Sequence, residues 1–254
     1  MYDQVCYQKS FLKQVIIKVD FASPLVELQK GVPTRLLNTI IKTFPIIEPA
    51  EMLAHELSIN GESVQSKQTM IKQWNYFAKD RSSQLTISSE SIFVLYVTYK
   101  SFEETKEQFA VVIDALLKAF QDTKASRFGL RYINEIDPPL VDPTKWDEYI
   151  NPKLLSNREF FDENETLTRL INIAELQYDD INVRFQFGIP NPDYPAPVKR
   201  PLFVLDLDAS VSQAHDLAEV LPYMEAAHQH IQTIYERSIT NELRGKMDVR
   251  PVQE

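Results

Sequence analysis

Four segments of this chain alternate apolar and polar residues one by one, and this pattern constrains the fold more than any other. The alternating segments are KQVIIKVDF (13–21), RFGLRYINEI (127–136), INVRFQFGI (181–189) and LFVLDLDAS (202–210). Successive side chains of a β-strand point to opposite faces, so strict alternation predicts a strand with one buried face and one polar face. A sheet of such strands needs to be covered on one side only, which is typical of antiparallel sheets.

Helical patterns lie between these strands. Apolar residues recur at helical spacing in 32–44 and again in 102–121, where Ser101 and Glu104 have the spacing of a helix cap. We expect a further helix over 213–243, with a break or a true start at Pro222 because the residue before a proline avoids helical geometry. The remaining predictions are shorter strands at 55–63, 69–79, 84–89, 91–100 and 168–178, and a short helix that opens at Asp142–Pro143.

The predicted elements repeat in the same order. A strand, a helix, several antiparallel strands and a second helix occur in residues 11–122 and again in 126–245, although the two halves share no sequence identity. We therefore predict an α+β fold in which two pseudo-repeats form one curved antiparallel sheet with helices on one face, as a single domain over 1–254. This order resembles the duplicated, saddle-shaped fold of the TATA-binding protein, an analogy that concerns the fold alone.

The composition argues against several classes of protein. The five glycines are scattered singly, so neither a P-loop nor a GxGxxG nucleotide-binding motif can be built from them. The single cysteine excludes an internal disulfide, and the net charge of −9 disfavours coating of bulk nucleic acid. No signal peptide pattern and no apolar run of about 20 residues occurs, so we expect a cytoplasmic protein without a membrane helix.

The polar sides of the predicted strands should assemble into one surface. Its predicted members are Lys18, Asp20, Arg131, Arg184, Gln186, Asp206 and Asp208, with Trp74 nearby. Two interpretations remain open for this surface. Its charges could face water and pair across strands, which contributes only about 0–1 kcal/mol for each pair. Alternatively, arginine and aromatic anchors could make it a binding surface.

No constellation of catalytic residues is apparent. Asp206 and Asp208 would point the same way on a strand, as ligands of a divalent cation must, but two arginines are expected on the same face and would neutralise them. His228 and His230 do not share a face of a helix. Neither GxSxG nor HExxH occurs. We therefore expect no catalytic residue, no metal and no cofactor, with a metal-dependent hydrolase as the least favoured alternative.

Several segments together carry a family resemblance. They are PLVELQ (24–29), QWNYF (73–77), YKSFEETKEQFAVVIDAL (99–116), RFGLRYIN (127–134), LFVLDLDA (202–209) and ERSITNELRGKM (236–247). This succession resembles a sporadically distributed family of uncharacterised prokaryotic proteins of about this length. The strand-like KQVIIKVDF that precedes PLVELQ departs from the family pattern. The resemblance implies no activity, but such a patchy distribution is associated with accessory genes, including antiviral defence and toxin–antitoxin systems.

The sequence thus predicts a non-catalytic binding or regulatory protein that acts on a protein partner, which a neighbouring gene could encode. The alternative is a nucleic-acid or nucleotide-binding module that uses the arginines of the polar surface, because guanidinium groups suit phosphate recognition. The charge around Arg131 and Arg184 distinguishes the two. A positive surface favours phosphate ligands, whereas a neutralised surface favours protein.

Overall fold

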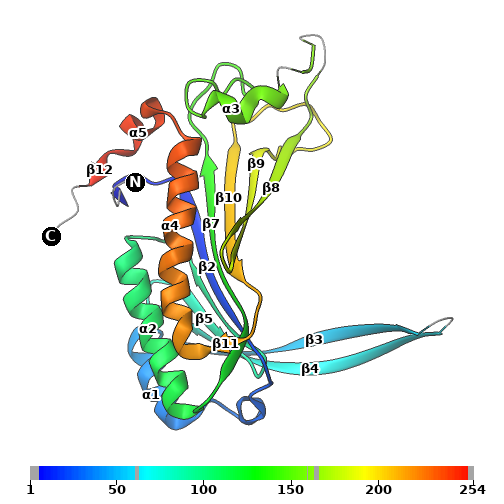
Figure 1. The fold of residues 1–254 in the computed structure, drawn as a ribbon, viewed down its shortest axis with the longest axis vertical. Coiled ribbons are helices and arrows are strands. Elements are labelled where there is room, and N and C mark those ends of the chain that lie inside the picture. The colour runs from blue at the N-terminus through cyan, green and yellow to red at the C-terminus, as the bar shows by residue number, and fades with distance from the viewer. Residues whose placement is uncertain (1–5, 61–62, 159, 163–165, 251–254) are drawn as a thin grey trace. The chain divides into compact units, whose positions relative to one another are not determined.

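The computed structural model describes residues 6–60, 63–158, 160–162 and 166–250. Within these residues the protein is α+β, with one large antiparallel sheet of ten strands and five α-helices (Figure 1). The strand order is β3-β4-β5-β6-β2-β7-β10-β9-β8, with β11 paired to β7, while β1 and β12 form a separate pair. None of the helices in the described residues is both long and apolar enough to span a bilayer.

The described elements have the following bounds. The strands are β1 Cys6–Tyr7, β2 Leu12–Phe21, β3 Ile46–Asn60, β4 Ser63–Phe77, β5 Ser83–Ile87, β6 Ser91–Tyr96, β7 Lys124–Ile136, β8 Leu170–Tyr178, β9 Ile181–Ile189, β10 Phe203–Val211, β11 His215–Asp216 and β12 Val249–Arg250. The α-helices are α1 Thr34–Thr43, α2 Phe102–Ala119, α3 Pro152–Leu155, α4 Val220–Ser238 and α5 Asn241–Met247. Three short 3₁₀ helices are η1 Val26–Gln29, η2 Ser156–Arg158 and η3 Leu217–Glu219.

The chain divides into two compact units. The α2 unit comprises residues 16–129 and 212–221, and the α4 unit comprises the described residues of 1–15, 130–211 and 222–254. Each unit is named here after its longest helix. Strands β2 and β7 contribute residues to both units.

In the α2 unit, helices α1 and α2 pack against each other. The alternation in 13–21 buries Ile17, Val19 and Phe21, as predicted. Helix α2 begins where its cap was expected, because the Ser101 side-chain oxygen accepts a hydrogen bond of 3.1 Å from the Glu104 amide. Such a cap satisfies a backbone donor that the first helical turn leaves unpaired.

The hairpin of β3 and β4 is much longer than the sequence predicted. Instead of short strands at 55–63 and 69–79, two strands of 15 residues pair along their whole length. Only Trp74–Phe77 of β4 also pairs with β5. Pro49 lies inside β3, an edge strand, where a missing N–H is tolerated.

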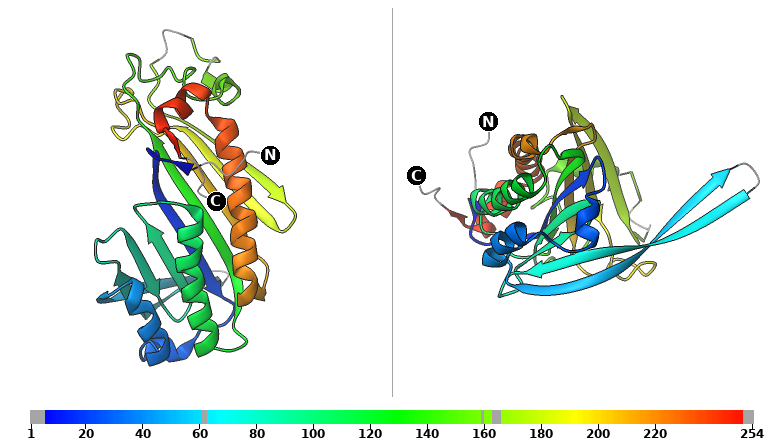
Figure 2. Two further views of the ribbon diagram at one scale, coloured as in Figure 1. Left: turned by 90° about the vertical axis from the view of Figure 1, so that its left-hand side faces the viewer. Right: turned by 90° about the horizontal axis from the view of Figure 1, so that it is seen from below.

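In the α4 unit, the faces of the strands are those that the alternation predicted. Helix α4 lies along one side of this unit's strands (Figure 2). Leu130 and Tyr132 of β7 are buried, and the Tyr132 hydroxyl lies 3.0 Å from His228 Nδ1 on α4. The apolar positions of β9 and β10 are buried as well, at Val183, Phe185, Phe203, Leu205 and Leu207.

Two predicted helices differ from the structure. Turns occupy the chain from Asp142, and α3 begins only at Pro152, although Trp146, Tyr149 and Ile150 are buried as expected. The predicted helix over 213–243 is two helices: α4 begins at Val220, close to the true start that the sequence allowed at Pro222, and α5 follows after Ser238. Pro222 lies in the first turn of α4, where a helix needs no N–H from the residue.

Candidate functional site

The predicted polar surface exists in the α4 unit as two rows of side chains across β8, β9 and β10. They lie on the face opposite the buried residues, and this face is called the polar face below. Because the strands pair without a bulge, residues at matching positions stand side by side. The two rows are Glu175–Arg184–Asp208 and Ile173–Gln186–Asp206.

Arg131 of β7 binds Asp206 through two N–H groups of its guanidinium. Nε donates to Oδ1 at 2.7 Å and Nη2 donates to Oδ2 at 2.6 Å. The Asp206 side chain is only 6% exposed and that of Arg131 is 39% exposed. Hydrogen bonding to Asp206 is the main cause that raises the pKa of Arg131, and the charge of Asp208 adds to it. Asp206 therefore uses both carboxylate oxygens on an arginine and does not present them to a cation.

Arg184 is also neutralised, but more loosely. Its Nη2 donates to Gln186 Oε1 at 3.1 Å, and its Nε lies 3.7 Å from Glu175 Oε1 on the neighbouring strand. The side chains of Arg184 and Glu175 are 39% and 56% exposed. Both arginines therefore pair with a carboxylate on a neighbouring strand, as the first of the two open interpretations supposed, and the polar face carries no uncompensated cluster of positive charge at these positions.

Three residues that were predicted on or near the surface, Lys18, Asp20 and Trp74, belong to the α2 unit instead. Lys18 Nζ forms an ion pair of 2.7 Å with Asp20 Oδ1 on its own strand. Trp74 donates its indole N–H to the carbonyl oxygen of Leu28 at 2.9 Å. This bond ties β4 to η1, so the structure gives Trp74 a role in holding the α2 unit together.

Two residues of the polar face, Ile173 and Glu175, were not predicted from the sequence. Both lie on β8, at the end of the strand order. Ile173 is 54% exposed, although it is a large apolar residue. The alternation in LINIAELQY carries the signal, since Ile173, Glu175 and Gln177 are the exposed set along the strand. This signal in the sequence is weak because both faces of an edge strand are only partly covered.

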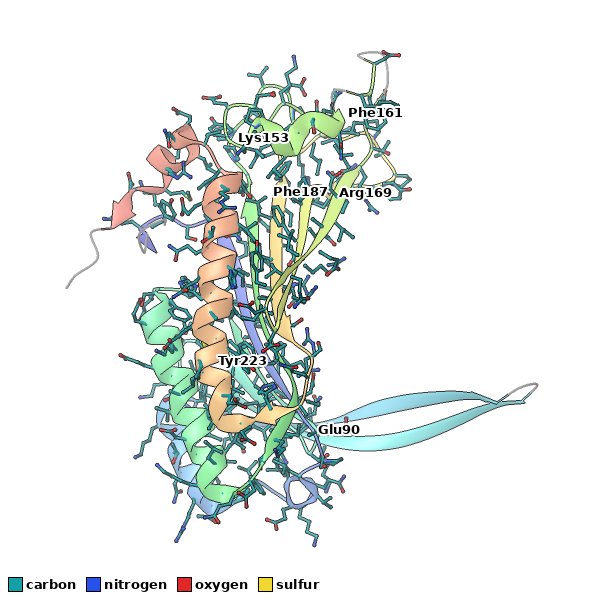
Figure 3. The ribbon with its side chains drawn as sticks, viewed as in Figure 1. Glu90, Lys153, Phe161, Arg169, Phe187 and Tyr223 are labelled. Atoms are coloured by element: carbon teal, nitrogen blue, oxygen red, sulfur yellow. The ribbon has the colours of Figure 1, made fainter. Side chains whose placement is uncertain are left out.

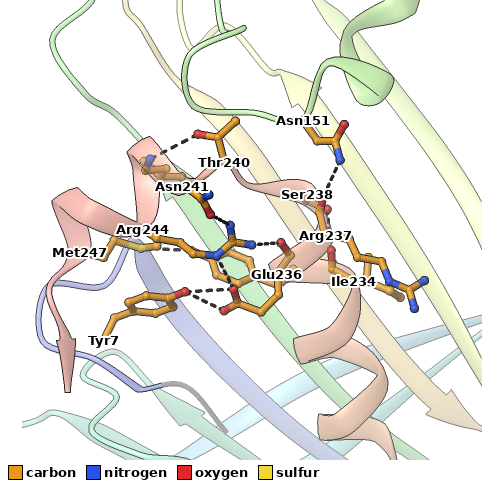
Figure 4. Close-up of polar contacts among 12 residues, drawn as sticks. Tyr7, Asn151, Ile234, Glu236, Arg237, Ser238, Thr240, Asn241, Arg244 and Met247 are labelled. Atoms are coloured by element: carbon orange, nitrogen blue, oxygen red, sulfur yellow. Dashed lines mark hydrogen bonds and ion pairs between the residues drawn. The ribbon is translucent and has the colours of Figure 1, made fainter. Parts of the chain in front are cut away.

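A buried polar network that the sequence analysis also missed joins the start of the chain to its last helices (Figure 4). Glu236 is 2% exposed and accepts hydrogen bonds from the Tyr7 hydroxyl at 2.8 and 3.0 Å and from Arg244 Nε at 2.9 Å. Arg244 also donates to the Glu236 carbonyl oxygen and to Asn241 Oδ1. Burial, with a further contribution from the Glu236 charge, raises the pKa of Tyr7. Because these donors and acceptors satisfy one another, the network is structural in character.

The two histidines of α4 have separate surroundings, in line with their spacing. His228 is buried against Tyr132, with ring centroids 5.8 Å apart. His230 stacks on Tyr178 of β8, with centroids 4.1 Å apart and an interplanar angle of 15°. Burial lowers the pKa of His230. The pair therefore forms no common site.

The described part of the chain contains no cluster of metal ligands. No group there brings together three or more side chains of His, Cys, Asp or Glu in a way that could hold a metal ion. No protein-family model matches the chain, and no curated protein matches its sequence.

Proposed function

We propose that this protein is a non-catalytic binding or regulatory protein and that it recognises a protein partner through the polar face of the α4 unit. The observation that carries the proposal is the neutralised character of that face. Asp206 compensates Arg131, Glu175 lies beside Arg184, and the exposed Ile173 stands in the adjoining row. Such a mixture of paired charges and apolar surface is typical of protein interfaces, whose centres are depleted of uncompensated charge.

Strand β8 adds a second means of recognition. Its nine residues pair with β9 over their full length, and among the described residues no further strand pairs with its other edge. Edge strands are usually protected by proline, lysine or a bulge. The sequence LINIAELQY contains neither proline nor lysine and carries one charge, Glu175. The open edge of β8 suits the addition of an extended segment of a partner.

The same contacts weigh against the two alternatives. A phosphate-binding surface needs arginines whose donors are available, whereas Arg131 is occupied by Asp206 in a bidentate pair. A hydrolase that used Asp206 and Asp208 as metal ligands would first have to displace Arg131 from Asp206. Neither alternative is supported by a specific observation.

Five finer elements of the hypothesis complete the proposal. We propose that the chain is a single domain of two pseudo-repeats, 11–122 and 126–245, because each compact unit contains its own strands and its own long helix. We also propose membership of the sporadically distributed prokaryotic family described above, a cytoplasmic location, and a partner encoded by a neighbouring gene. A role in antiviral defence or in a toxin–antitoxin pair follows from that resemblance.

Site-specific crosslinking in the native host tests the proposal. A photoreactive benzoylphenylalanine replaces Ile173 on the polar face or, as the control, Val111 on α2, which is 43% exposed. We expect a crosslinked protein of defined mass from position 173 and not from position 111. An Ile173→Lys substitution should abolish the interaction while the melting temperature holds. Identical products from both positions, or nucleic acid captured at position 173, would contradict the proposal.

A further inference from the structure

A pocket of about 370 Å³ lies in the α4 unit, beside α3 and η2. Figure 3 shows Phe161, one of its lining residues, at the same end of this unit as Lys153 of α3. Small-molecule sites in proteins typically enclose about 300–1,000 Å³ and are lined mainly by apolar side chains with a few polar groups. The size of this pocket falls within that range. It is formed by residues that play no part in the polar face.

The inner wall of the pocket is apolar and firmly packed. Trp146 and Phe203 are 1% and 2% exposed, and their ring centroids are 5.3 Å apart. The Trp146 indole N–H donates to the carbonyl oxygen of Pro143 at 3.1 Å, so the ring is held in place. At the outer side, Phe161 is 38% exposed and lies edge-on to Phe160, which is 85% exposed. Exposed aromatic rings beside a preformed pocket favour an apolar guest.

One buried polar atom of the wall makes no hydrogen bond with the described residues. Nε of Arg158 is buried and makes no hydrogen bond within the described part of the chain. Leaving a buried donor unpaired is unfavourable, and more so for a charged group, so such groups normally have a partner. Asp142 does not serve as this partner, because its Oδ1 already accepts hydrogen bonds from the amide and hydroxyl of Thr144. Lys145 adds a second positive charge to the wall, and the exposed Asp147 adds a negative one.

We infer that this pocket binds a small organic monocarboxylate with an apolar body. The body would lie against Trp146 and Phe203, and the carboxylate would accept a charge-assisted hydrogen bond from Arg158. Hydrogen bonds between an arginine and a carboxylate are roughly twice as strong as neutral ones, which gives the anion its advantage over a neutral molecule of the same shape. The site is separate from the proposed partner-binding face, so either assignment can fail without the other.

The fluorescence of Trp146 reports directly on occupancy. The chain has two tryptophans, and a Trp74→Phe background leaves Trp146 as the only one. Titration with octanoate should change its emission in a saturable way, whereas 1-octanol, which has the same chain without the charge, should bind at least tenfold more weakly. No saturable change with octanoate, or equal affinity for octanoate and octanol, would overturn the inference.

Two variants and a control locate the binding. Arg158→Gln should weaken octanoate binding at least tenfold and leave octanol unaffected. Lys153→Gln removes the same charge from α3, outside the lining of the pocket, and should leave both affinities unchanged. Leu154→Phe should obstruct the pocket and weaken the binding of octanoate and octanol alike, with circular dichroism to verify the fold, and it keeps Trp146 as the only tryptophan. Octanoate binding that survives Arg158→Gln, or that falls equally in Lys153→Gln, shows that general charge is responsible and refutes the site.

Discussion

The pair of Arg131 and Asp206 should stabilise the α4 unit far more than its place on a polar face suggests. An exposed ion pair contributes about 0–1 kcal/mol. Removing one partner of a fully buried pair costs about 3–5 kcal/mol, because the other charge is left uncompensated. Here the Asp206 side chain is 6% exposed and that of Arg131 is 39% exposed, so the pair lies between these limits. We expect Arg131→Ala to lower the free energy of unfolding by about 2–3 kcal/mol, which is roughly 30- to 150-fold in the equilibrium constant.

Urea denaturation followed by Trp146 fluorescence in the Trp74→Phe background measures this loss in the α4 unit. Asp206→Ala should cost less than Arg131→Ala, because the half-exposed guanidinium can turn to water. The double variant should be less destabilised than the sum of the two, with a coupling energy of about 1–2 kcal/mol. Arg184→Ala is the matched control, and its loss should stay within about 1 kcal/mol because Arg184 and Glu175 are both substantially exposed. Equal small losses for Arg131→Ala and Arg184→Ala would refute the argument from burial.

Three further predictions concern single side chains. Tyr132→Phe should cost about 1–2 kcal/mol because it removes a buried hydrogen bond to His228. Tyr96→Phe should instead be neutral or stabilising, since the buried Tyr96 hydroxyl has no hydrogen-bond partner among the described residues. Urea denaturation of both variants decides the sign of each. Gly188→Ala should cost about 1–3 kcal/mol from backbone strain alone, because φ at this residue is +140°. A Cβ there would also lie 2.1 Å from the Leu170 carbonyl oxygen. A stable Gly188→Ala variant would contradict this prediction. The pKa of His230 is lowered in the folded protein, so the unfolded chain binds a proton at this residue more readily. The contribution of His230 to stability is therefore present above pH 6.5 and is lost as the pH falls below that value. His230→Gln should flatten the pH dependence of unfolding below pH 6.5, and an unchanged profile would argue against it.

The sequence by itself determined the α+β class and which side of each central strand is buried. Alternation of period two is a local property, and it assigned Tyr132 to the core and Arg131 to the polar face correctly. The cap at Ser101 was equally local, because a hydroxyl oxygen three residues before an amide of the first turn suffices to accept a hydrogen bond from that amide. The prolines were less decisive, because Pro222 allowed either a break or a true start of the last helix and Pro49 lies inside an edge strand. Whether a missing N–H matters depends on whether the residue lies at a sheet edge or in a first helical turn, which residue type does not reveal.

Tertiary structure decided three features: the charge pairing on the polar face, the buried network around Glu236 and the pocket beside α3. Arg131 and Asp206 are 75 residues apart, and Tyr7 and Glu236 are 229 apart, so no local pattern relates them. The row of Glu175, Arg184 and Asp208 depends on the register of three strands, and a slip of one residue would turn every one of these side chains to the other face. The pocket depends on the packing of chain segments around Arg158, whose buried Nε is a property of its surroundings. Periodicity indicates which way a side chain faces, but only the packed chain determines what it faces.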